Sequence, residues 1–112
     1  MKFFLLLIIF IVSPALIHAK TLTIGSKNFT ESYILAEIMA QLAQKIGEAE
    51  VVRKFGLGGT GITFQALEKN EIDLYPEYTG TISEAILKDP NLKDWKSLKE
   101  KLDTENLQIS LS

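Results

Sequence analysis

The sequence contains no cysteine, and its single histidine, His18, lies within the first nineteen residues. The rest of the chain therefore cannot form a disulfide, a thiol nucleophile, a Cys/His zinc site or a histidine-dependent catalytic triad. Most familiar hydrolase chemistry depends on one of these groups. We therefore expect no enzyme of these kinds, and no cofactor or metal site.

An excess of basic residues is also missing. Residues 1–19 contain one of the twelve basic residues and none of the fourteen acidic ones, which leaves eleven against fourteen, a net charge of −3, in residues 20–112. No lysine- and arginine-rich stripe marks a surface for nucleic acid. We therefore expect no nucleic-acid partner.

Residues 1–19 have the pattern of a cleaved secretory signal peptide. Lys2 precedes an apolar run over 3–12, Ser13-Pro14 interrupts it, and Ala19 offers a small residue at the cleavage point. Ten apolar residues are too few for a stable membrane-spanning helix, although an uncleaved anchor is the alternative. No cysteine follows to carry a lipid, so we expect a periplasmic protein beginning near Lys20.

The 93 residues from 20 to 112 are enough for one small domain. Residues 107–112 have the composition of the start of a strand, so we expect a product that is truncated at that point.

The predicted elements alternate between strand and helix. A strand over 21–25 leads into a helix that is capped by Asn28 with Glu31, in a variant of the capping box, and stops at Gly47. Six apolar residues recur along one face of this helix and are expected to be its core face: Ile34, Leu35, Ile38, Met39, Leu42 and Ile46. Further strands are expected over 51–55 and 72–75, and further helices over 62–69, 82–87 and 95–101.

This order predicts an α/β fold, a parallel sheet with helices on both faces. Ligands of such sheets bind outside the carboxyl ends of the strands. The loops after the three strands, residues 26–29, 56–61 and 75–81, should therefore meet at one edge and carry the site.

The loop 56–61 matches the dinucleotide fingerprint, with Gly56, Gly58 and Gly61 at the required spacing. The strand before it carries Arg53 and Lys54, whereas the strand before the fingerprint is normally buried and central. A dinucleotide-binding enzyme is one alternative. Glycines that allow a tight turn are the simpler explanation.

Lys27 lies between the first strand and the following helix, where a lysine can anchor an anion or remain a solvated surface residue. Tyr78 follows Pro76 in a loop and is a better ligand candidate than Tyr75, with the Thr81 hydroxyl close by. Asp73 is better explained as a structural cap than as half of a catalytic pair with Glu77.

Three segments resemble the substrate-binding proteins of ABC importers for glycine betaine, choline and carnitine. They are residues 24–31, residues 57–62 followed by Ala66-Leu67, and residues 72–81. The resemblance implies the amino-terminal lobe of a two-lobed, type II periplasmic binding fold, truncated before the second lobe, and delivery of a quaternary ammonium osmolyte to an inner-membrane permease.

The resemblance also implies roles for single residues. Tyr78 is similar to a wall of the family's aromatic cage, and Thr81 is similar to the residue that donates to the carboxylate end of the ligand. Lys27 is similar to the polar residue that follows the first strand. Thr60 and Gly61 complete the expected ligand-binding set, with position 61 similar to the one that tunes ligand breadth. Half a cage open to water gives about 0.5–1 kcal/mol of cation–π attraction per ring, so weak binding is expected. A truncated remnant without function is the remaining alternative.

Overall fold

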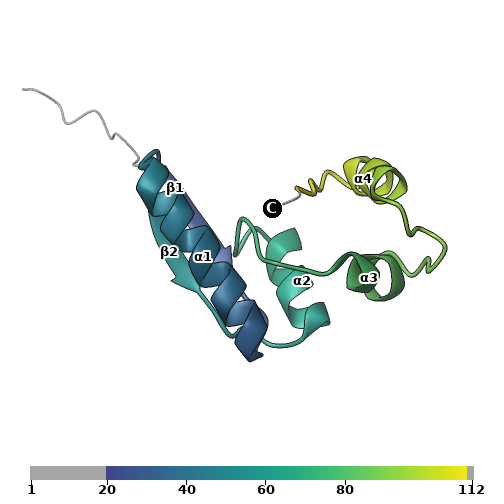
Figure 1. Ribbon diagram of the computed structural model, residues 1–112, viewed down its shortest axis with the longest axis horizontal. Helices are drawn as coiled ribbons and strands as arrows, with labels where there is room; N and C mark the ends of the chain where they lie inside the picture. The colour runs from purple at the N-terminus through teal and green to yellow at the C-terminus, as the bar shows by residue number, and fades with distance from the viewer. Residues whose placement is uncertain (1–19, 111–112) are drawn as a thin grey trace, which may run out of the picture.

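The computed structural model describes residues 20–110, and the predicted leader 1–19 lies outside the described residues. Figure 1 shows the order of the elements. They are β1 (Thr21–Gly25), α1 (Thr30–Ile46), β2 (Glu50–Lys54), α2 (Thr60–Glu68), the short α3 (Thr79–Thr81), the π-helix η1 (Ile82–Ile86) and α4 (Trp95–Thr104). The predicted α/β class with a parallel sheet is confirmed.

The sheet is built around β1, the more apolar of the two strands. β1 pairs with β2 in parallel, from Thr21 opposite Glu50 to Gly25 opposite Lys54. On its other side β1 meets residues 72–75 through one parallel bridge, Ile24 to Leu74. β2 therefore lies at the edge of this sheet, which suits its charged residues Arg53 and Lys54.

The prediction of a third strand over 72–75 is wrong, because this segment makes only the bridge. The Asp73 amide donates to Thr23 O at 2.8 Å, and Gly25 N donates to Leu74 O at 2.8 Å. The amide of Thr23 donates to the Asp73 carboxylate at 2.7 Å, and not to a backbone carbonyl as in a regular ladder. Pro76 then follows without an N–H to donate. Asp73 has a structural role, as expected, but it binds a strand amide.

The predicted start of α1 is also corrected. Phe29 occupies the N-cap position with no side-chain cap, so Asn28 and Glu31 do not form a capping box. The predicted end is confirmed, because Gly47 adopts a left-handed φ of 74° and its amide donates to Ala43 O.

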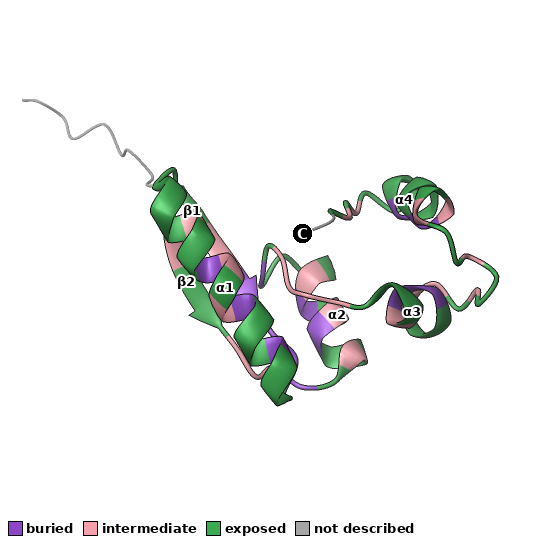
Figure 2. Ribbon diagram, in the orientation of Figure 1, coloured by how far each residue is buried: buried purple, intermediate pink, exposed green. Residues whose placement is uncertain are grey.

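The face of α1 that packs on the sheet differs from the expected one. Its buried residues are Ser32, Ala36 and Ala40, four residues apart, and Ile24 packs against the two alanines. Small side chains allow close approach to the strands. Of the six residues expected to face the core, Met39 alone packs against this cluster. Four others form a ridge on the outward side, which we call the α1 ridge: Ile34, Ile38, Leu42 and Ile46, exposed by 51–69%, and Leu35 is 36% exposed. Figure 2 shows α1 largely exposed on this side.

A second core forms where η1 and α4 meet. Leu98 and Leu102 of α4 pack against Ile82, so the helix predicted over 95–101 buries a narrow apolar seam. The helix predicted over 82–87 is present, but it begins as α3 and continues as a π-helix. α1 packs on both strands, whereas α2 packs on η1.

Residues 107–110 form no strand, contrary to the expectation for this segment, and 111–112 lie outside the described residues. Within residues 20–110, no helix is long and apolar enough to cross a membrane.

The reversed faces of α1 can be tested by substitution. Ile38→Gln should change the free energy of unfolding by less than about 0.5 kcal/mol, because Ile38 lies on the exposed ridge. Ala36→Leu should cost about 1–3 kcal/mol by overpacking a fully buried position. Urea unfolding measures both. Equal costs would show that the α1 ridge is covered in solution.

A second prediction concerns the ion pair that joins α1 to β2. Arg53 donates to both Glu37 oxygens at 2.8 and 2.9 Å, and this bond lowers the pKa of Glu37 from 4.5 to about 2. The charged pair therefore stabilises the fold fully above pH 4.5, and this contribution is lost as the pH falls toward 2.

The free-energy difference between the wild type and Glu37→Gln should shrink as the pH falls through this interval, measured by urea unfolding at several pH values. Arg53→Gln is the matched control, because it should remove the same pH dependence. A difference that stays constant with pH would contradict the pairing.

Candidate ligand-binding site at the ends of the strands

Two of the three predicted loops are joined by hydrogen bonds at the carboxyl ends of β1 and β2. The Gly56 amide donates to Ser26 Oγ at 2.8 Å, and Asn28 N donates to Gly58 O at 3.0 Å. Gly56 and Gly58 have φ values of 71° and 151°, which other residues rarely adopt. The glycines thus permit the tight turn, which is the simpler explanation of the fingerprint.

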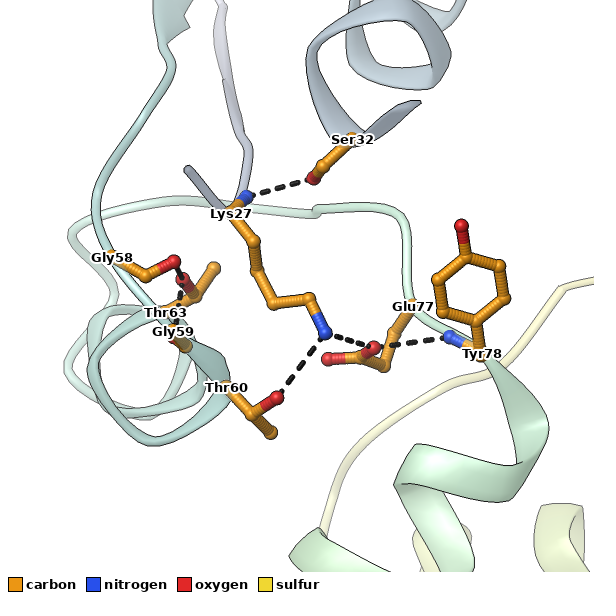
Figure 3. Close-up of polar contacts among 8 residues, drawn as sticks. All are labelled: Lys27, Ser32, Gly58, Gly59, Thr60, Thr63, Glu77 and Tyr78. Carbon is orange, nitrogen blue, oxygen red and sulfur yellow. Dashed lines mark hydrogen bonds and ion pairs between the residues drawn. The ribbon is translucent and has the colours of Figure 1, made fainter. Parts of the chain in front are cut away.

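Lys27 connects all three loops. Its ammonium donates to Glu77 Oε1 at 2.7 Å and to Thr60 Oγ1 at 3.1 Å, as Figure 3 shows. Its backbone amide donates to Ser32 Oγ at 2.8 Å at the start of α1. The Lys27 side chain is 7% exposed and that of Glu77 is 6% exposed. Lys27 is therefore half of a buried ion pair and not a solvated surface lysine.

Glu77 has a second partner in the backbone. Its Oε1 also accepts the Tyr78 amide at 3.1 Å, while Oε2 is buried and has no hydrogen-bond partner of good geometry. Burial raises the pKa of the Tyr75 phenol, and the negative charge of Glu77 raises it further. Tyr75 is half-buried, and Glu77 couples it to the ion pair.

Two aromatic rings lie beside the ion pair. The rings of Phe29 and Tyr78 are nearly parallel, at 19°, with centroids 6.5 Å apart. The Lys27 ammonium lies 5.3 Å from the Phe29 centroid and 6.0 Å from that of Tyr78. Both rings also reach solvent, with exposures of 39% and 42%. A ligand cation can therefore approach them from outside.

The remaining predicted residues surround this group. Thr60 is the first residue of α2 and bonds Lys27 directly, and Gly61 follows it. A Cβ added at Gly61 would have no neighbour within 4 Å, so this position faces open space. Thr81 ends α3, one turn after Tyr78, and among residues 20–110 no hydrogen bond joins it to the Lys27–Glu77 pair.

Sequence reasoning missed two members of the cluster. Neither Phe29 nor Glu77 is in the predicted ligand-binding set. The signal for Glu77 was its position directly beside Tyr78, but its pairing with Lys27 spans fifty residues and has no local pattern.

Residues 20–109 match the family described as the substrate-binding domain of ABC-type glycine betaine transport systems. The chain belongs to this family. The family resemblance inferred from the motifs is thereby confirmed, and the family is one of transport substrate-binding domains and not an enzyme family.

Curated relatives are similar over most of the chain. The domain is 35% identical over 104 residues to the glycine betaine-binding protein YehZ of Escherichia coli, covering 88% of this chain and 33% of that protein. It is 36% identical over 92 residues to the Helicobacter pylori ergothioneine transport permease/ergothioneine binding protein EgtU, covering 80% and 16%. A glycine-betaine-binding protein of Pseudomonas aeruginosa is 44% identical over 69 residues, covering 62% and 22%. The chain thus spans a third or less of these relatives.

The buried pair gives a prediction for stability. Lys27→Met should cost about 3–5 kcal/mol, because it leaves the Glu77 carboxylate buried without its counter-ion. The double variant Lys27→Met/Glu77→Leu should recover much of this loss, since it removes both charges. Urea unfolding measures the two variants. A double variant less stable than Lys27→Met would contradict this account.

Proposed function

We propose that this substrate-binding domain binds a quaternary ammonium osmolyte, such as glycine betaine or choline, for delivery to an ABC permease in the inner membrane. The observation that supports this most directly is the solvent-exposed aromatic pair of Phe29 and Tyr78 beside a buried, self-neutralised ion pair. Quaternary ammonium groups shed water easily and are attracted to aromatic faces. No catalytic role is proposed.

In this proposal Tyr78 is the principal wall for the cation, and Phe29 is a second wall. Thr81 donates to the carboxylate or hydroxyl end of the ligand, and Thr60 and Gly61 border the same space. The Lys27 ammonium is already engaged by Glu77 and Thr60, so it acts mainly by holding the loops and has one remaining N–H for a ligand. Residues 1–19 would direct the protein to the periplasm.

Binding by this chain should be weak. Two exposed rings contribute about 0.5–1 kcal/mol each, which is far less than the roughly 4 kcal/mol of a millimolar complex. NMR titration of the full chain with choline and with glycine betaine should therefore give shifts of the Tyr78 and Phe29 ring signals without saturation below about 1 mM. Tyr78→Ala should abolish the ligand-dependent shifts at Phe29.

Tyr33→Ala is the matched control. Tyr33 is as exposed as Tyr78, at 40% against 42%, but it packs edge-on against Phe55 instead of Phe29. Its removal should leave the ligand shifts unchanged. Shifts that survive Tyr78→Ala would overturn the site, and a folded wild-type chain that shows no shift with either ligand would favour a remnant without binding function.

A further inference from the structure

The α1 ridge and its neighbour Leu35 gather five exposed apolar side chains on one side of α1. Exposed apolar residues that occur singly are common on protein surfaces, but a contiguous group is typical of an interaction surface. α1 packs on β1 and β2 by its opposite side. Figure 2 shows the outward side of the helix exposed, so the ridge is left uncovered by the part of the chain that the structure describes.

Charged residues of opposite sign occupy the two ends of this outward side. Residues seven apart in a helix differ by only about 20° around its axis, so Glu31, Ile38 and Lys45 lie almost in line. Glu31 is in the first turn of α1, Lys45 is in the last turn, and both are exposed. The outward side is therefore acidic where the helix begins, apolar in the middle and basic where the helix ends.

We propose that the outward side of α1 binds the same side of a second copy of this chain, with the two helices antiparallel. A twofold axis at Ile38 sets the two Ile38 side chains against each other. It also sets Ile34 of each copy opposite Leu42 of the other, and Glu31 of each copy opposite Lys45 of the other. The same patch is used by both copies, as a twofold interface requires.

The charges select the antiparallel direction. Parallel helices would set Glu31 against Glu31 and Lys45 against Lys45, which is repulsive at both ends, whereas antiparallel helices gain an attraction at both ends. This dimer goes beyond the proposed function, because the ridge carries no residue of the proposed ligand-binding set.

The spacing along the helix fits a close pairing of limited length. Five residues follow one another at intervals of four and three, as in the seam of a coiled coil: Glu31, Leu35, Ile38, Leu42 and Lys45. The seam covers only two heptads, and five partly exposed side chains bury less than the roughly 800 Å² per partner of a standard interface. We therefore expect a weak dimer, with a dissociation constant on the order of 0.1–1 mM, which is dissociated at the micromolar concentrations of urea unfolding.

Sedimentation equilibrium of the full chain at concentrations that span this range tests the proposal. Ile38→Glu should raise the dissociation constant at least about tenfold, because it sets two carboxylates against each other at the centre of the interface. The matched control is Ile62→Glu, since Ile62 is 61% exposed against 51% for Ile38 but lies on α2. It should leave the dissociation constant unchanged.

Two outcomes would overturn the dimer. One is a wild type that stays monomeric above the expected dissociation constant, which would leave the ridge for another occupant. The other is association that Ile38→Glu leaves unchanged or that Ile62→Glu weakens equally. Residues 1–19 are the same in every variant, so association through their apolar run would not respond to Ile38→Glu.

Charge reversal tests the direction of the helices. Lys45→Glu should weaken association by about two- to fivefold, because it sets a carboxylate against Glu31. Glu31→Lys/Lys45→Glu exchanges the two charges and should restore the association of the wild type, with the fold checked by circular dichroism. A double variant that associates no better than Lys45→Glu, with its fold intact, would contradict the antiparallel pairing.

Single cysteines report the contacts directly, because the chain has none of its own. Glu31→Cys mixed with Lys45→Cys under mild oxidation should give the mixed disulfide dimer faster than either variant alone gives its own. Ile38→Cys should cross-link to itself, since this position lies on the twofold axis. Faster cross-linking of Glu31→Cys to itself would indicate parallel helices and overturn the proposal.

Discussion

The buried contact between Lys27 and Glu77 is the interaction on which the site depends. It connects the loop after β1, the first turn of α2 through Thr60, and the segment that leads into α3. Removing two charges from water is costly, so such a pair adds little net stability compared with apolar residues. Its contribution is geometric, because the two charges compensate each other only if these three segments keep fixed relative positions. The same positions place Phe29 beside Tyr78.

The strands bring these segments together. β1 lies between β2 and the bridge at Leu74. The three parallel segments therefore end side by side, and the loops that follow them start from neighbouring positions. Positive φ values at Gly56 and Gly58 turn the second loop back onto Ser26. The same glycine spacing that resembles a dinucleotide fingerprint therefore has a structural explanation within this fold, as a tight turn packed on the loop after the first strand.

Much of the fold could be predicted from local patterns. The positions of β1, β2 and α2, the glycine stop of α1 and the seam of α4 follow from propensity and periodicity. The buried face of α1 could not, because periodicity reports where large apolar residues gather and not which face the strands contact. Ala36 and Ala40 allow the closer approach, and the α1 ridge is left exposed. The prediction of a third strand failed because the Asp73 carboxylate accepts the Thr23 amide, where a regular strand would offer a backbone carbonyl.

The sequence by itself determined the family, the parallel α/β class and the three loops that carry polar and aromatic residues, because each of these is a short motif or a local preference. It also identified Lys27, Thr60 and Tyr78 as candidates. Only the tertiary structure decided what Lys27 does, since its partner lies fifty residues away and no local pattern records that distance. Lys27 could have been an anchor for an anion, but its charge is compensated by Glu77 because the two groups are buried in contact with each other. The resulting neutral pair lies beside the rings of Phe29 and Tyr78.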